Sequence, residues 1–230
     1  MPETAPLRVL STLAVMGVLQ DVIPAREAAT RERIEAVYAP TAKLLERIRD
    51  GAEADIAILT AEAVDALVAA GTMRAGSRVD LAISVIGVAV KAGAARPDIA
   101  TPEAFRAALL AAKSIAYSRA GASGIFFAGL IDRLGIGPEV NAKATVIPQG
   151  FTAELAANGA VELAIQQVSE LMTVAGVDIV GPLPAAVNVR AVFSGGVMAG
   201  AATGADELLG YFREASTAGL LEAKGLLPIE

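Results

Sequence analysis

The strongest constraint on the fold of this chain is a regular alternation of short apolar runs with amphipathic stretches. Three runs near the N-terminus have the length and β-branched content of buried strands, and a helical pattern of apolar residues follows each one. These runs are Leu7–Leu10, Ile34–Tyr38 and Ala54–Leu59. Strands that alternate with helices in this way predict an α/β fold, with mainly parallel sheets flanked by helices.

The helices that follow these strands have recognisable ends. The first is expected over about Val15–Ala29; Thr41 and Thr60 are candidate N-caps of the next two, which Gly51 and Gly71 end.

Further along the chain, Val79–Lys91 is a long apolar segment suited to a strand that leaves one lobe for another. A helix capped by Thr101, with Pro102 in its first position, comes next. Strands are expected at Ser114–Tyr117, within 141–150 and 161–171, and across 189–200, and the segment 204–228 is expected to form one closing helix. We therefore expect lobe I at 1–84, lobe II at 85–190 and a return to lobe I at 191–230.

The composition excludes several classes of function. Hydrophobic residues make up 54% of the chain, but no apolar run reaches the roughly 20 residues of a membrane span, so we expect no membrane insertion. A net charge of −6 provides no basic field for nucleic acid.

Histidine and cysteine are both absent. Disulfides, thiol catalysis, Ser-His-Asp triads and His- or Cys-ligated metals are therefore excluded, and we expect neither a metal nor a cofactor. Any acid–base chemistry falls to Glu, Asp, Lys or Tyr.

The N-terminal segment, MPETAPLRVLSTLAVMG, has no basic region before an apolar stretch and no clear cleavage site. We expect a periplasmic location if a leader was removed before this sequence begins, and a cytoplasmic location otherwise.

Small polar residues follow several predicted strands, at the sheet edge where α/β proteins bind ligands. Helix N-termini at this edge offer free N–H groups to an anion, and neighbouring hydroxyls can donate as well. The alternative for each residue is an ordinary cap or turn role. The candidate ligand-binding residues are Ser11, Thr12, Thr41, Ser118, Ser123, Gln167 and Ser169.

Two charged residues lie in the same type of position. Arg119 directly follows Ser118 and could clamp a carboxylate with its planar guanidinium; the alternative is a solvated loop arginine. Glu170 is the first candidate for a base, ahead of Tyr117 and Lys43, although a helix-start carboxylate facing water is the simpler interpretation.

Three long segments together resemble the molybdate-binding-like extracellular solute-binding proteins, which have the type II periplasmic-binding-protein fold. They begin at "LRVLSTLAVMG", at "VIGVAVKAGAARPDIATPEAF" and at "AVFSGGVMAGAATGADELLGYF". The resemblance implies two lobes with a ligand cleft between them, a small anionic ligand, and an ABC transporter permease as partner. Ser11, Thr12 and Thr41 match the hydroxyl residues of the family's first two loops.

Arg119 departs from the neutral hydrogen-bond cage of molybdate binders, and this departure favours an organic di- or tricarboxylate. Aconitate isomerase, which shifts a double bond in a tricarboxylate, is similar to the same fold. The sequence therefore favours a binding protein for a small anion, with a cofactor-independent isomerase acting on a substrate such as aconitate as the alternative.

Overall fold

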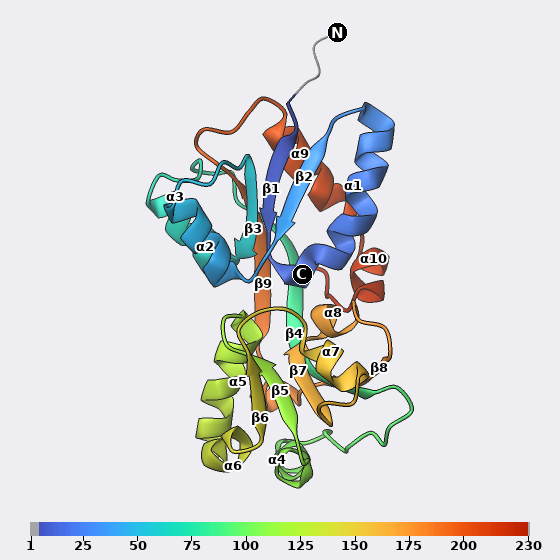
Figure 1. Ribbon diagram of the computed structural model, residues 1–230. Coiled ribbons are helices and arrows are strands. Elements are labelled where there is room, and N and C mark those ends of the chain that lie inside the picture. The colour runs from blue at the N-terminus through green and yellow to red at the C-terminus, as the bar shows by residue number, and fades with distance from the viewer. Residues whose placement is uncertain (1–4, 230) are drawn as a thin grey trace. The chain divides into compact units, whose positions relative to one another are not determined.

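The chain divides into two units, each organised around its own set of strands (Figure 1). The computed structural model describes residues 5–229. Of these residues, unit 1 contains those up to Ile83 and those from Ala191 onward, and unit 2 is Ser84–Arg190. The predicted α/β class is confirmed, because helices flank the strands in both units.

The sheet of unit 1 is parallel where its strands alternate with helices. Its strand order is β2-β1-β3-β9, followed by the first residues of β4. The central strand β1 runs parallel to β2 and β3, whereas β9 is antiparallel to β3. The strands are β1 (Leu7–Ser11), β2 (Ile34–Tyr38), β3 (Ile56–Thr60), β4 (Val79–Lys91) and β9 (Arg190–Val197).

Alternating side chains of these strands pack on opposite faces of the sheet, as the pleat requires. Val9 and Ile58 contact one hydrophobic cluster together with helices α1 and α9. Leu10 and Leu59 contact a second cluster with α2 and α3. The helices of unit 1 are η1 (Leu13–Val15), α1 (Met16–Thr30), α2 (Thr41–Arg49), α3 (Ala61–Ala69), α9 (Ala205–Ala215) and α10 (Ala218–Ala223).

Unit 2 repeats this arrangement with a more mixed sheet. Its order is β4-β7-β5-β6, and β8 also pairs with β4. Strand β5 is parallel to β6 and β7, whereas β4 is antiparallel to β7 and β8. The strands introduced here are β5 (Ile115–Ser118), β6 (Ala144–Ile147), β7 (Leu163–Gln167) and β8 (Val177–Pro182).

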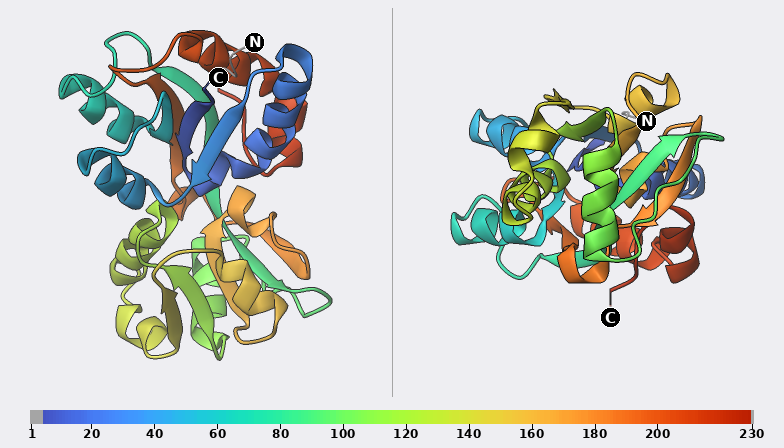
Figure 2. Two further views of the ribbon diagram at one scale, coloured as in Figure 1. Left: turned by 45° about the horizontal axis from the view of Figure 1, so that its top comes forward. Right: turned by 90° about the horizontal axis from the view of Figure 1, so that it is seen from below.

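The two faces of this sheet are packed differently. Large side chains such as Phe105 and Phe127 fill the side of α4 and α5. Alanines dominate the side of α7 and α8, which allows α7 to lie close to the strands (Figure 2). The helices of unit 2 are α4 (Pro102–Ala111), α5 (Ala122–Arg133), α6 (Gly137–Asn141), α7 (Thr152–Ala157), α8 (Val168–Leu171) and η2 (Ala185–Val187).

The local predictions have mixed outcomes. The strand at Val79–Lys91 is confirmed, and Thr101 does cap α4, because its hydroxyl accepts the Ala104 N–H at 3.1 Å. The capping role of Thr41 is wrong: Pro40 occupies the N-cap position, and its carbonyl accepts the first N–H bonds of α2. Thr60 is the N-cap residue of α3, but its side chain makes no capping hydrogen bond.

The prediction of one closing helix is also wrong. Helix α9 ends at Ala215, and a new helix, α10, begins at Ala218. The break occurs because the Thr217 hydroxyl accepts the Leu220 N–H at 3.3 Å and so caps the second helix. Within residues 5–229, no helix is both long and apolar enough to cross a membrane.

Candidate functional site

The candidate site in unit 2 is at the edge where strands β5 and β7 end. The two strands are parallel neighbours, with Ile115 beside Leu163 and Ala116 beside Ala164. Their carboxyl ends therefore share one edge of the sheet, where the loops after both strands begin. This register brings Ser118 and Gln167, predicted from separate motifs, to the same edge.

Three serine hydroxyls near this edge are buried without a hydrogen-bond partner. They belong to Ser118 at the end of β5, Ser123 in the first turn of α5 and Ser169 in α8. A buried hydroxyl without a partner costs about 1–3 kcal/mol of desolvation, so proteins seldom leave one in this state. Each of these three hydroxyls is therefore a candidate contact for a polar ligand.

Two glycines allow the start of α5 to pack directly on the end of β5. A Cβ atom at Gly124 would lie 1.6 Å from the Ser118 carbonyl oxygen, and one at Gly121 would lie 2.6 Å from the Ser118 hydroxyl. Gly121 is also the N-cap of α5 and provides no capping side chain. The positive end of this twelve-residue helix is therefore left open beside Ser118 and Ser123.

Glu170 is buried, with 7% of its surface exposed, so the interpretation of a water-facing carboxylate is wrong. Burial raises the pKa of Glu170 to about 7, and a hydrogen bond from Gln166 opposes this rise only partly. No ion pair of Glu170 with another of the described residues accompanies this burial. A carboxyl group in this state is half protonated near neutral pH and can both accept and return a proton.

The side chain of Gln166 is itself held in place. Its oxygen accepts hydrogen bonds from the Thr152 N–H at 2.8 Å and the Thr152 hydroxyl at 2.9 Å, and its nitrogen donates to the Gly150 carbonyl at 3.0 Å. The sequence did not predict these hydrogen bonds, because they join the end of β7 to the start of α7, fourteen residues apart in the chain. The only local signal was the pair of glutamines at the end of an apolar strand.

The remaining candidate ligand-binding residues of unit 2 differ in whether their side chains already have a hydrogen-bond partner. The Gln167 side-chain oxygen already accepts a hydrogen bond from the Ser84 hydroxyl at 2.8 Å. Arg119 is exposed, and its guanidinium makes no hydrogen bond or ion pair with another described residue. Its backbone N–H donates to the Ile147 carbonyl, so the start of the loop is fixed while the charge stays available.

The other two candidate bases are engaged elsewhere. The Tyr117 hydroxyl donates to the Asn141 side-chain oxygen at 2.7 Å, and burial raises its pKa above the ordinary value. Lys43 is exposed and forms an ion pair with Glu46 at 2.7 Å. Glu170 is therefore the titratable group best suited to proton transfer. No group of three or more acidic residues within 5–229 could hold a metal ion.

Unit 1 carries its own polar cluster at the ends of β1 and β2. Ser11 is paired with Tyr38 in the parallel register, and both Ser11 and Thr12 are buried. The Ser11 hydroxyl donates to the Thr12 carbonyl at 3.1 Å. Thr41 is the first residue of α2, beside this edge and partly exposed. Because Ser11, Thr12 and Thr41 lie in unit 1 and Ser123 in unit 2, their convergence on one ligand stays a prediction.

The fold and the polar strand ends together define a protein of the type II periplasmic-binding-protein class. The chain belongs to the bacterial extracellular solute-binding protein family, whose model matches residues 7–227. Aconitate isomerase from a Pseudomonas species is 35% identical over 231 residues, which cover 97% of this chain and 88% of that protein.

Solved structures confirm the resemblance of the fold. The periplasmic molybdate-binding protein of Azotobacter vinelandii superimposes with a TM-score of 0.79 at 17% identity, over 97% of this chain and all of that one. A sulfate-binding protein of Mycobacterium tuberculosis gives a TM-score of 0.73 at 16% identity, over 99% of this chain and 88% of that one.

Proposed function

We propose that this protein is a cofactor-independent isomerase that moves a proton within an unsaturated tricarboxylate such as aconitate. The observation that carries the proposal is Glu170, a buried carboxyl with a pKa of about 7 and no cationic partner among the described residues. A buried acid of this kind suits proton transfer, a step that simple capture of an anion does not require. The full-length similarity to an aconitate isomerase supports the same choice of reaction.

The reaction needs one group that takes and returns a proton. Ionised Glu170 would remove a proton from the methylene carbon next to one carboxylate, and the electron pair left behind would delocalise over the allylic carbons and their carboxylates. Protonated Glu170 would then return the proton to the carbon at the other end of this system. The double bond moves, no atom is lost, and no electron acceptor is required.

The other groups of the site suit the anionic charge of such a substrate. The hydroxyls of Ser118, Ser123 and Ser169 can each donate to a carboxylate oxygen, and the first N–H groups of α5 point out of the open helix end. The free guanidinium of Arg119 would bind a further carboxylate. Fixed donors of this kind stabilise the negative charge that builds up on the substrate in the transition state.

The test is to incubate the protein with cis- or trans-aconitate in D₂O and to follow isomer ratio and deuterium uptake by NMR. We expect interconversion above the buffer rate, lost in Glu170→Gln and retained in Glu154→Gln, a change of an exposed glutamate in α7. Binding of aconitate to Glu170→Gln would show that this variant keeps a folded site. Tight binding by the native protein without exchange or interconversion would refute the isomerase.

The second candidate is a periplasmic binding protein that delivers a small anion to an ABC transporter permease. Membership of the solute-binding family and the three buried serine hydroxyls without a hydrogen-bond partner favour it. A thermal-shift screen of oxyanions, dicarboxylates and tricarboxylates would identify the ligand. Calorimetry on Thr41→Ala and Ser123→Ala would then test whether these two hydroxyls bind the ligand. A hydrogen bond to a charged group is worth about 1.5–3 kcal/mol, so we expect each variant to bind about tenfold more weakly or worse. Unchanged affinity in both variants would return these residues to structural roles.

A further inference from the structure

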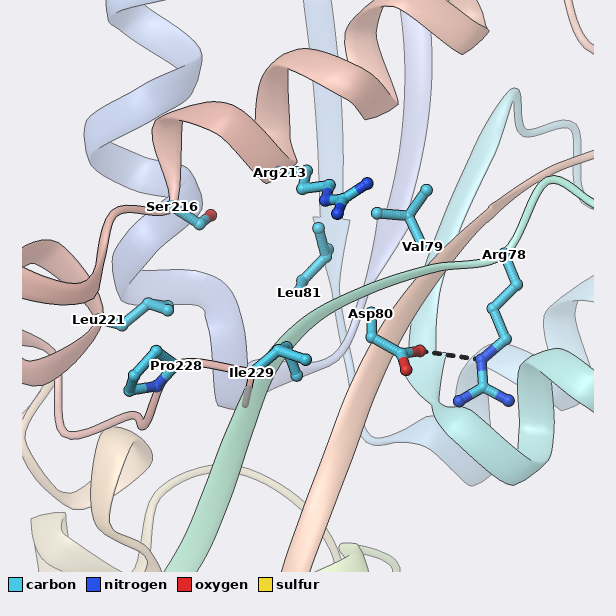
Figure 3. Close-up of a pocket in the computed structure, with 9 residues that line it drawn as sticks. All are labelled: Arg78, Val79, Asp80, Leu81, Arg213, Ser216, Leu221, Pro228 and Ile229. Carbon is cyan, nitrogen blue, oxygen red and sulfur yellow. Dashed lines mark hydrogen bonds and ion pairs between the residues drawn. The ribbon is translucent and has the colours of Figure 1, made fainter.

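The pocket at the start of β4 does not form one charged site (Figure 3). Asp80 Oδ1 accepts hydrogen bonds from Arg78 Nε at 2.9 Å and from the Ser194 hydroxyl at 2.6 Å. Arg213 lies over Leu81, on the face of the sheet that packs against α9. Neighbouring residues of a strand point to opposite faces, so Asp80 and Arg213 are separated by the sheet. An open polar group lies further along β4, in unit 2.

Ser84 and Gln167 form a buried hydrogen bond between β4 and β7. The Ser84 hydroxyl donates to Gln167 Oε1 at 2.8 Å, and the two residues are 0% and 2% exposed. The backbone of Gln167 is held as well, because it pairs with Ile86 in the antiparallel register of the two strands. The amide oxygen of Gln167 is therefore turned toward Ser84, and the amide nitrogen is turned away from it.

The amide nitrogen of Gln167 has no hydrogen-bond partner among the described residues, although it carries two N–H donors. The enclosed polar side-chain atoms without a partner in this part of the chain are three serine hydroxyls. Gln167 Nε2 is not one of them, so it keeps contact with the solvent. The neighbouring Gln166 differs, because Thr152 and Gly150 bond both its oxygen and its nitrogen. Gln167 thus presents a fixed donor to whatever binds beside it.

The Gln167 side chain reaches past the end of its own strand. In the antiparallel pair, Ile86 lies opposite Gln167, the last residue of β7, so Ser84 lies beyond that end. To meet Ser84, the Gln167 side chain must extend over the edge where β5 ends at Ser118 and α8 begins. The hydroxyls of Ser118 and of Ser169 in α8 are buried there without partners. Donors from β5, β7 and α8 therefore gather at one edge of unit 2.

We propose that Gln167 donates through its side-chain nitrogen to an anionic oxygen of the ligand, and that Ser84 is the positioning residue that fixes this donor. A carboxylate or an inorganic oxyanion accepts such a bond, whereas an ammonium group would meet a donor and gain nothing. The contact rests on the anion site of the proposed function, and it serves that site whether the ligand is isomerised or only captured.

The test is calorimetry with trans-aconitate, and with inorganic molybdate and sulfate as further probes. Gln167→Met keeps the length of the side chain but removes the donor, so we expect about tenfold weaker binding or more. Ser84→Ala lets the amide rotate and lowers the population of the competent orientation, so we expect about three- to tenfold weaker binding. Gln20→Met, a change of an exposed glutamine in α1, is the matched control and should bind normally.

Two further measurements separate binding from folding. Gln167→Met leaves the buried Ser84 hydroxyl without its partner, whereas the double variant Ser84→Ala with Gln167→Met removes both partners. The double variant should therefore have the higher Tm of the two, and it should bind the anion as weakly as Gln167→Met. The NMR signals of the Gln167 side-chain amide, assigned by their loss in Gln167→Met, should move when the anion is added to the native protein.

Several outcomes would overturn the assignment. Native affinity in Gln167→Met, or amide signals that stay in place at saturating anion, would show that Gln167 does not contact the ligand. Native affinity in Ser84→Ala would remove Ser84 from its positioning role. No saturable binding of any of the three anions up to about 10 mM would refute the contact as well. Binding of trans-aconitate without isomerisation would refute only the proposed isomerase, so the two failures can be told apart.

Discussion

Replacing Glu170 by glutamine should make the protein more stable at alkaline pH and remove part of its pH dependence. In the unfolded chain Glu170 titrates near its ordinary value of 4.5, and in the folded protein burial moves the pKa to about 7. The folded state therefore holds the proton more tightly than the unfolded state. The resulting stabilisation is complete below pH 4.5 and is lost as the pH rises through about 7.

The size of this effect follows from the distance between the two pKa values. At about 1.4 kcal/mol for each pH unit, the span from 4.5 to about 7 corresponds to about 3.5 kcal/mol. For a chain of 230 residues this is a shift in Tm of about 7–14 °C. Glutamine has nearly the same shape as glutamate and does not titrate, so the stability of the variant lacks this pH-dependent contribution.

The assay is thermal unfolding followed by circular dichroism at pH 5 and pH 8.5, for the native protein, Glu170→Gln and Glu154→Gln. We expect the Tm of the native protein to fall relative to that of Glu170→Gln between the two pH values, while Glu154→Gln follows the native protein. The comparison between variants cancels the titration of all other groups. Parallel pH dependence in the native protein and Glu170→Gln would show that the buried carboxyl is solvated or paired in solution.

Three further predictions concern local packing and capping. Gly124→Ala should lower the free energy of unfolding in urea by about 3 kcal/mol or more, because its Cβ would lie 1.6 Å from the Ser118 carbonyl oxygen. Gly129→Ala, in the same helix, should be tolerated. Equal losses of stability in the two variants would contradict the argument. Thr101→Ala should cost about 1 kcal/mol through the lost cap of α4, and Thr60→Ala clearly less, since Thr60 makes no side-chain cap; the difference in Tm checks this. Ser118→Ala should leave the stability of the ligand-free protein unchanged or higher, because its hydroxyl has no partner to lose; a Tm lowered by several degrees would reveal a hidden partner.

Much of the fold could be predicted because it depends on local patterns. The β-branched run at 79–91 forms one strand over its whole predicted length, and Thr101 with Pro102 marks the start of α4 as predicted. One error arises because a backbone carbonyl, and not a side chain, accepts the first N–H groups of a helix. Pro40 occupies the N-cap position of α2 that was assigned to Thr41.

The candidate site was only partly accessible to sequence reasoning. Residues at the ends of parallel strands could be named, because that edge of a sheet is where loops and helix N-termini meet. The burial of Glu170 could not be predicted, because α8 has only four residues and no periodicity that distinguishes an inner from an outer face. The hydrogen bonds of Gln166 depend on tertiary contacts between β7 and α7, which no local pattern reports.

The layer of alanines under α7 has a consequence for how this protein can evolve. Ala153 and Ala156 of the helix meet Ala116 and Ala164 of the strands, and this close contact sets the depth at which Thr152 reaches Gln166. A single step to valine at any of these positions would lift the helix and shift the side chain that restrains Glu170. Selection on the surroundings of Glu170 would therefore be visible in the sequences of related proteins as an absence of larger residues in this alanine layer.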